Sequence, residues 1–231
     1  PRQLRVSHLL NMTSGIPYAD NWGISVRGAA ALFDEIISGQ NSGHDLTTAE
    51  ICRKAAKIPL MFLPGDGWYY GISADIMGGI IEAVSGMRYS EFLRKNIFEP
   101  LEMDDTGFYV PAEKAGRFAA LYKWQENALV RDDGNYLGLT AYSKAPEFES
   151  GGAGLVSTIA DYSKFARLLA NKGEFGGVRL FSEKTFEFMT TPQLGRQQLK
   201  GLWDRLQGYN YGNFMRILEN PEKSQLKTVK G

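Results

Sequence analysis

The sequence has little of several features that mark whole classes of protein. Its single cysteine, Cys52, excludes an internal disulfide and a C-x-x-C metal site. Lysine plus arginine equals aspartate plus glutamate, at 26 each, so no net charge favours nucleic acid or an acidic membrane surface as a partner. No apolar run approaches the roughly 20 residues that span a bilayer. We expect a globular protein with no nucleic-acid partner and no membrane span, and this composition leaves its compartment open.

Metal ligands and phosphate-binding loops are also scarce. His8 and His44 are the only histidines, and neither belongs to an H-x-x-x-H or H-E-x-x-H pattern, so surface or capping roles suit them better than zinc. The glycine-rich stretch ESGGAGLVST, residues 149–158, has no G-x-G-x-x-G and no Walker lysine. We therefore expect no metal and no cofactor. The glycines are better explained by close passage of the backbone past another segment or a ligand.

Three other patterns could carry chemistry, but each has a simpler interpretation. Cys52 could pair with a histidine as a nucleophile, yet it lies mid-helix beside apolar Ile51, where a structural cysteine is expected. The acidic cluster at 102–105 follows a helix-ending proline and suits a solvated turn better than acid/base catalysis. Ser224 and Lys227 have Ser-x-x-Lys spacing, but the surrounding charged segment has little apolar surface to desolvate the lysine.

Hydrophobic periodicity predicts mainly helices, with strand signals growing toward the end of the chain. The clearest helix begins at Thr158, which has Asp161 in capping-box spacing, and stops at Gly173. Its predicted buried face consists of Ile159, Tyr162, Phe165, Ala166 and Leu169. Further helices are predicted at 6–10, 26–39 (closed by Gly39), 47–58 (opened by Thr47 and Glu50 in capping-box spacing), 72–85 (with Gly86 beyond its end), 89–99 and 182–191. Extended segments are predicted at 117–142 and one strand at 208–218.

These elements predict one incomplete domain. Residues 1–200 form a helical lobe with a small extended insertion, and residues 201–231 begin a terminal sheet. The chain starts at Pro1 within an amphipathic pattern, and its last residues, SQLKTVKG, show no helix cap. We interpret the sequence as an interior piece of a longer protein, so the absence of a signal peptide is uninformative.

Three segments, taken in order, resemble the serine β-lactamase-like family, which includes class C β-lactamases, penicillin-binding carboxypeptidases and related esterases. They are VSHLLNMTSGIP at 6–17, the stretch from FLPGDGWYYGIS to IFEPLEMDDTGF at 62–108, and SGGAGLVSTIADYSKFARLL at 150–169. In the first, Asn11 and Met12 stand where the family usually has a polar residue and often has histidine. The resemblance covers most of the chain and implies an α+β, β-lactamase/transpeptidase-like fold.

The resemblance also implies functional residues. Tyr70 matches the tyrosine of the second catalytic motif, which serves as general base or proton relay. Gly71 stands where that motif has a small residue, and Ile72 where lactamases have Asn. Together with Gly151 and Gly152 of the third segment, these two are implied to bind substrate. A free phenol has a pKa near 10, so Tyr70 could act as a base only beside cations.

The pattern is incomplete in this sequence. The family places Ser-x-x-Lys roughly forty residues before VSHLLNMTSG, and no such motif precedes it here. The final KTVKG does not match a Lys-Thr-Gly third motif, because two residues separate Thr228 from Gly231. The resemblance therefore implies a segment of a serine hydrolase acting on an amide, lactam or ester, with no activity of its own.

Several alternatives remain open. Tyr70 could be a rim tyrosine that packs on Trp68. Gly71 and Ile72 mildly favour a non-catalytic binding protein on the same scaffold. A carboxylesterase is an alternative to a lactamase, because esterase-like members of the family are less strict at the position of Ile72. Because strands that pair with the last one would be missing, self-association through an exposed sheet edge is a further hypothesis.

Overall fold

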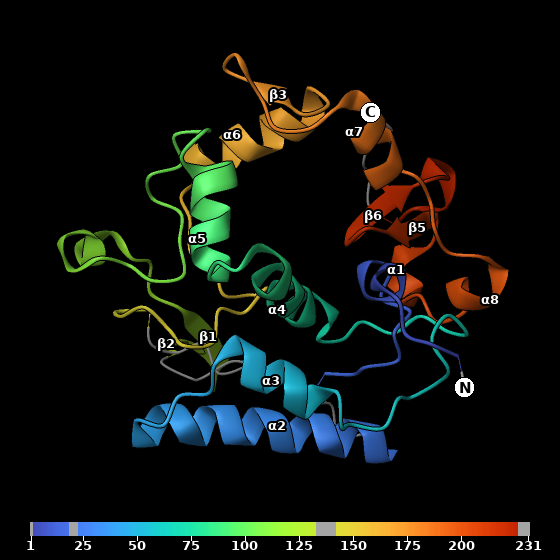
Figure 1. Cartoon of the computed structure of the whole chain (residues 1–231), viewed down its shortest axis with the longest axis horizontal. Helices are drawn as coiled ribbons and strands as arrows, with labels where there is room; N and C mark the ends of the chain where they lie inside the picture. Colours follow the sequence, from blue (N-terminus) through green and yellow to red (C-terminus); the bar gives the residue numbers. More distant parts are fainter. Residues whose placement is uncertain (1, 19–22, 133–141, 226–231) are drawn as a thin grey trace.

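The structure is a computed structural model that describes residues 2–18, 23–132 and 142–225 (Figure 1). In this described part of the chain, helices combine with three two-stranded antiparallel hairpins, which confirms the predicted α+β class. No helix within these ranges has the length and apolar character needed to cross a membrane. Figure 1 shows α2 and α3 along one side, α4 in the middle and the last hairpin beside α1.

The first layer packs α2 (Gly23–Ser42), α3 (Thr48–Ala55) and α4 (Ser73–Ser85) around one apolar cluster, with α1 (Val6–Leu10) at its edge. We call it the first core; its buried members are Leu9, Ile16, Leu32, Phe33, Ile36, Ile51, Ala55, Ile72 and Phe148. The predicted capping box at α3 is confirmed. The Thr47 hydroxyl accepts from the Glu50 amide at 3.3 Å, and the Glu50 carboxylate accepts from the Thr47 amide at 2.9 Å.

Helix α2 runs past the predicted stop at Gly39, so that boundary was wrong. The helix ends at Ser42, before Gly43 in the left-handed conformation (φ +77°). Gly39 serves a packing role instead. A Cβ atom at Gly39 would lie 2.5 Å from the carbonyl oxygen of His44, because the chain turns back over the last turn of the helix. Glycine at position 39 is therefore explained by this close backbone contact, and not by the end of the helix as predicted.

The second layer contains α5 (Tyr89–Leu93), its π-helical continuation η1 (Arg94–Phe98) and α6 (Ile159–Ala170). The short hairpin of β3 (Glu174–Phe175) and β4 (Val178–Arg179) and helix α7 (Glu183–Met189) follow. The apolar cluster of this layer, the second core, has as buried members Leu93, Phe98, Leu101, Met103, Phe108 and Leu168.

The existence and N-cap of α6 were predicted correctly, and Phe165 of its predicted buried face packs against the second core, but other members of that face are exposed. Ile159 is 92% exposed and Tyr162 63% exposed, whereas Leu168 and Asp161 are buried. The Asp161 carboxylate accepts from the Asp105 amide at 2.7 Å and from the Thr106 hydroxyl at 3.1 Å. These polar contacts fix the rotation of the helix, which apolar periodicity alone cannot do.

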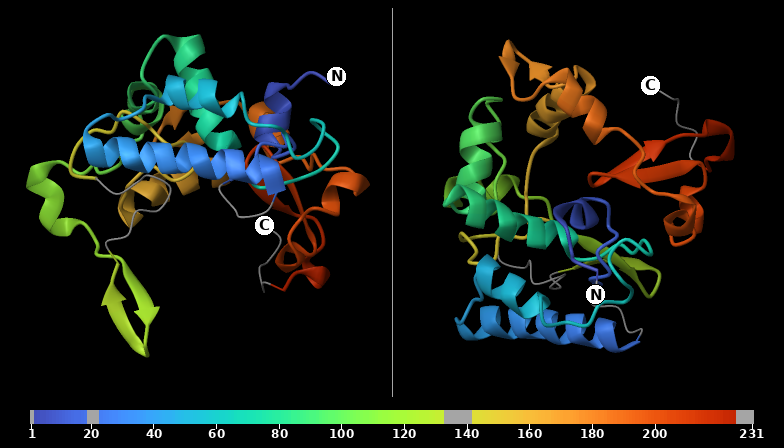
Figure 2. Two further views of the ribbon diagram at one scale, coloured as in Figure 1. Left: turned by 90° about the horizontal axis from the view of Figure 1, so that it is seen from below. Right: turned by 45° about the vertical axis from the view of Figure 1, so that its right-hand side comes forward.

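The remaining elements are two hairpins and short helical turns. After η2 (Ala112–Arg117), the hairpin of β1 (Tyr122–Gln125) and β2 (Ala128–Arg131) projects from the body, as Figure 2 shows. Most of the extended segment predicted at 135–142 lies outside the described residues. Near the end come α8 (Arg196–Leu199), η3 (Asp204–Leu206), β5 (Tyr209–Gly212), β6 (Met215–Leu218) and η4 (Pro221–Lys223).

The single strand predicted at 208–218 is in fact a complete hairpin. Strands β5 and β6 pair in register from Tyr209–Leu218 to Gly212–Met215. Between them, Asn213 and Phe214 have φ of +50° and +61°, as a two-residue turn with both central residues left-handed requires. The Phe214 amide donates to the Leu10 carbonyl at 2.8 Å, so the hairpin is attached to the end of α1.

Candidate functional site

The first two family-like segments lie side by side before α4. Backbone amides of the 61–69 loop donate to carbonyl oxygens of the 12–15 loop at three points. Tyr69 donates to Met12 at 3.0 Å, and Met61 donates to Gly15 at 2.8 Å. Gly65 bonds to the same loop in the same way. Met12 itself is buried in the left-handed conformation (φ +55°), which places the start of this loop in a strained but well-supported position.

Gly71 stands where the two segments come closest. A Cβ atom at this position would lie 1.9 Å from the carbonyl oxygen of Ile16, a distance that no side chain can tolerate. A hydrogen bond of 2.9 Å between the hydroxyls of Ser14 and Ser73, both fully buried, joins the segments again one turn further on. The glycine after Tyr70 is thus required by the packing of the backbone.

Tyr70 lies in the chain between residues that belong to two different apolar clusters. Ile72 is 1% exposed within the first core, and Trp68 is 3% exposed within a third cluster that includes Met12, Leu194 and Tyr211. Tyr70 itself is half-buried and packs against that third cluster. Because the residues two positions before and after Tyr70 are fixed in different cores, its backbone is held from both sides.

The third family-like segment, residues 150–169, also contacts the start of α4. A Cβ atom at Gly151 would lie 2.3 Å from the carbonyl oxygen of Ala74, in the first turn of α4. A Cβ atom at Gly152 would lie 2.6 Å from the Tyr18 hydroxyl. The predicted reason for these glycines, close backbone passage, therefore agrees with the geometry, and the helix start of α4 is where all three segments meet.

Asp75 holds this third segment in place. Its buried carboxylate accepts from the Ser150 hydroxyl at 2.5 Å and from the Gly152 amide at 3.2 Å. Burial raises the pKa of Asp75, although those hydrogen bonds partly oppose the rise. Burial, and then the negative charge of Asp75, raise the pKa of Tyr18 far above its usual value.

The ring of Tyr70 is surrounded by other aromatic rings. Its centroid lies 5.8 Å from that of Tyr18, 6.4 Å from that of Trp68 and 5.3 Å from that of Trp203. Trp203 is 39% exposed, and the Arg205 guanidinium stacks on its ring at 4.4 Å. Aromatic pairs at these separations are favourable, so the phenol lies beside an apolar, partly open wall.

The structure brings four of the five site residues predicted from the sequence together and buries the side chain of the fifth, Ile72. Tyr70, Gly71, Gly151 and Gly152 come together at the start of α4, whereas the Ile72 side chain points into the first core and its surface is unavailable. Packing of Tyr70 near Trp68, the simpler alternative, is present and is compatible with either role of the hydroxyl.

Sequence reasoning missed three residues of this site: Tyr18, Asp75 and Trp203. Two of them had a signal. Tyr18 directly follows the first family-like segment, and Asp75 is a charged residue within the apolar stripe of a predicted helix. Trp203 had none, because it is more than 130 positions from Tyr70 and only tertiary structure joins them.

The other residues that the sequence offered as candidates, among them Cys52, His8 and Ser224, lie outside this site. Burial, followed by the charge of Asp75, raises the pKa of Cys52 to about 11, which keeps its thiol protonated. Burial and nearby arginines lower the pKa of His8, whose Nδ1 accepts from the Arg5 amide at 3.1 Å. Ser224 follows the η4 turn, and Lys227 lies outside the described residues. Within the described ranges, no three His, Cys, Asp or Glu side chains gather as a metal site.

Comparison with known proteins places this geometry in context. A family model described as Beta-lactamase matches residues 1–213. Protein Rv1367c of Mycobacterium tuberculosis (strain H37Rv) is 30% identical over 97% of this chain and 54% of its own length. Esterase EstB of Burkholderia gladioli is 29% identical over 94% of this chain and 55% of its own length. The chain therefore spans about half the length of these relatives.

Solved structures agree on the fold. EstCE1, described as a hydrolase with promiscuous acyltransferase activity, superposes with a TM-score of 0.74 at 21% identity, over 94% of this chain and 56% of its own. The octameric penicillin-binding protein homologue from Pyrococcus abyssi gives a TM-score of 0.62 at 24% identity, over 92% of this chain and 43% of its own. The predicted β-lactamase/transpeptidase-like architecture is confirmed.

Proposed function

This chain belongs to the β-lactamase family, and on that basis we propose that it forms one wall of the active site of a serine hydrolase in which Tyr70 is the general base or proton relay. The observation that carries the proposal is the position of Tyr70: half-buried, fixed between two cores and at the point where three family-like segments meet. A residue that transfers a proton needs such a fixed position.

The proposed chemistry is acyl transfer in two steps. A serine hydroxyl attacks the carbonyl carbon of the substrate and gives up its proton toward the Tyr70 oxygen, and that proton goes on to the leaving group. Water then hydrolyses the acyl-enzyme with the same residue as base. Because a phenol at neutral pH needs cations to act in this way, we propose that the serine and the cations belong to parts of the protein outside these 231 residues.

We further propose that the substrate is an ester or amide with an apolar acyl or leaving group. The support is the wall of Tyr18 and Trp203 beside the Tyr70 ring, which offers aromatic surface for an apolar group. A relative of this chain is named Esterase EstB, which favours an ester as the substrate. The partly exposed backbones of Gly151 and Gly152 remain the proposed substrate contacts. Gly71 is buried against the Ile16 carbonyl, so its proposed contribution is to position Tyr70.

The test uses a protein extended to the length of the relatives. We expect Tyr70→Phe to lower kcat on a p-nitrophenyl ester roughly 10²-fold or more, and the control Tyr162→Phe, an exposed tyrosine on α6, to leave kcat unchanged. An unchanged kcat for Tyr70→Phe would remove Tyr70 from the mechanism. Parallel assays with a chromogenic cephalosporin separate esterase from lactamase activity.

The 231-residue chain alone is expected to turn over neither substrate. Clear turnover by this chain that disappears in Ser224→Ala would contradict the proposal, because it would place the nucleophile in the Ser-x-x-Lys spacing near the end.

A non-catalytic binding protein is the second candidate. It is favoured by the lack of side-chain hydrogen-bonding groups at Gly71 and at Ile72, which is 1% exposed. The reading frame upstream of Pro1 discriminates between the two: a Ser-x-x-Lys on a helical apolar pattern supports the enzyme, and a complete frame without one supports the binding protein.

A further inference from the structure

A cavity of about 690 Å³ lies in the second layer, and its lining includes neither Tyr70 nor the aromatic residues around that ring. It is formed by α5 and η1 on one side and by segments within 104–119, 145–149 and 156–158 on the other. Small-molecule sites typically measure roughly 300–1,000 Å³ and are mostly apolar with a few polar groups. The size of this cavity falls within that range.

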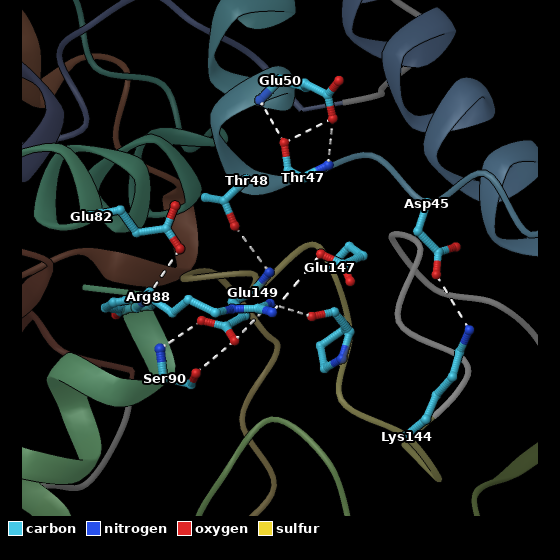
Figure 3. Close-up of polar contacts among 12 residues, drawn as sticks. Asp45, Thr47, Thr48, Glu50, Glu82, Arg88, Ser90, Lys144, Glu147 and Glu149 are labelled. Carbon is cyan, nitrogen blue, oxygen red and sulfur yellow. Dashed lines mark hydrogen bonds and ion pairs between the residues drawn. The ribbon is translucent and has the colours of Figure 1, made fainter. Parts of the chain in front are cut away.

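The walls of the cavity are tied together by buried contacts. Glu149, whose side chain is 3% exposed, accepts from the Ser90 amide and from the Ser90 hydroxyl, both at 2.6 Å (Figure 3). On the same side as Glu149, Gly107 and Val156 exchange two backbone hydrogen bonds of 3.1 and 2.8 Å. The cavity is therefore bounded by fixed segments, which reduces the ordering that a ligand would have to bring about.

The interior surface is largely apolar. Phe98 and Phe108 line the cavity and belong to the second core, at 9% and 4% exposure, so part of the lining is the outer surface of that core. Two further aromatic lining residues are solvent-exposed, Tyr109 at 43% and Phe118 at 48%. These rings provide contact area for an apolar group that enters from solvent.

The cations around the cavity are already paired within the protein. The Arg88 guanidinium donates to the Pro146 carbonyl at 2.7 Å and bonds to Glu149 at 3.1 Å (Figure 3). Lys114 and Arg117 both hold Asp105, at 2.7 and 2.8 Å, and these contacts lower the pKa of Asp105 to about 2, Arg117 having the larger effect. The fourth cation, Arg94, bonds to Glu99.

We propose that this cavity binds an uncharged, largely apolar small molecule. A ligand with a carboxylate, phosphate or sulfonate would have to compete with Glu149, Asp105 or Glu99 for its cation, whereas a neutral ligand covers apolar surface without breaking any pair. Burial of that surface supplies the binding free energy. The site is independent of the function proposed for Tyr70, because its residues contribute nothing to that chemistry.

The test measures binding of two fluorescent probes that share one ring system, neutral N-phenylnaphthylamine and anionic anilinonaphthalene sulfonate, to the 231-residue chain. We expect the neutral probe to bind saturably at one site and more tightly than the anion. Ala145→Trp and Ala119→Trp, two exposed alanines in the lining, should each weaken it about tenfold or more by filling the cavity. Ala83→Trp, at an exposed position on α4, is the matched control and should leave the affinity unchanged.

Three outcomes would overturn the proposal. They are absence of saturable binding of the neutral probe, tighter binding of the sulfonate probe than of the neutral one, and an affinity for the neutral probe that neither Ala145→Trp nor Ala119→Trp changes. In the last case, loss of binding in Trp124→Ser would locate the probe on the projecting hairpin, where Trp124 is 69% exposed. Thermal melts of each variant establish that the fold is intact, and having two filling variants protects the test if one of them fails to fold.

Discussion

Replacement of Gly71 by alanine should be among the most damaging small changes in this protein. The added Cβ atom would lie 1.9 Å from the Ile16 carbonyl oxygen and 3.1 Å from the Cα atom of Pro17. Ordinary carbon–oxygen contacts begin near about 3.3 Å, so the two backbones would have to separate by roughly 1.4 Å. Neither can move freely, because the Tyr69 amide bonds to Met12 and the Ile72 side chain is buried in the first core.

The expected cost follows from this geometry. Overpacking by about one methylene costs roughly 1–3 kcal/mol where side chains can adjust, and here the obstacle is backbone, so we expect about 3 kcal/mol or more. For a chain of this size, each kcal/mol lowers Tm by roughly 2–4 °C. Gly71→Ala should therefore melt about 6–12 °C below the wild type, as followed by circular dichroism or tryptophan fluorescence.

Gly116→Ala is the matched control. Gly116 lies in η2, and a Cβ atom there would meet nothing within 4 Å. Substitution at such a site changes stability by about 0.5 kcal/mol or less. Equal melting temperatures for Gly71→Ala and Gly116→Ala would refute the claim that close backbone contact, and not loop flexibility, requires glycine after Tyr70.

Four further outcomes are expected. Burial raises the pKa of Asp75, so ionisation of this carboxyl destabilises the fold as pH rises above the pKa of an aspartate in the unfolded chain, about 3.9. The Tm of Asp75→Asn relative to wild type should therefore rise between acidic and neutral pH, and a difference in Tm that does not change with pH would contradict this. The pKa of Asp105 is instead lowered to about 2 by Arg117 and a nearby lysine, so its contribution is present above about pH 4 and is lost as pH falls toward 2; melts of Asp105→Asn should match wild type only at the acidic end. Ser14→Ala should cost about 1–3 kcal/mol in urea unfolding, because it leaves the buried Ser73 hydroxyl and the Ile16 amide without the Ser14 hydroxyl. Ser73→Ala should cost less, because the Ser14 hydroxyl still accepts from the Ile16 amide, and the double variant should cost less than the sum of the two; strict additivity would disprove the coupling. Self-association through the edges of the β5–β6 hairpin should appear as a concentration-dependent mass in light scattering, and a constant monomer mass would count against it.

Local sequence signals fixed much of the secondary structure. The capping box at Thr47, the N-cap at Thr158 and the left-handed Gly86 depend on residues within one or two turns, and the helices that they delimit are present. The misplaced end of α2 and the unrecognised turn at 213–214 also concern glycine and left-handed positions, where a local pattern has more than one structural solution.

The candidate site was foreseen in part. Resemblance identified Tyr70 and the glycines beside it, but it gave no reason for Gly71 and assigned Ile72 to the substrate. The structure supplies the reason, since Gly71 lies against the Ile16 carbonyl and Ile72 anchors the loop in the first core. Trp203 is absent from any local pattern.

Short-range conformational preferences and residue identity were enough to place the starts of α3 and α6, the segments that resemble the family and the tyrosine of the second motif. Tertiary structure alone decided which face of α6 is buried, which segments converge on the first turn of α4 and where a cavity forms behind α5. The physical reason is that burial and close backbone contact are properties of pairs of segments distant in the chain. Either segment taken alone is compatible with many partners, and only the packed structure selects one.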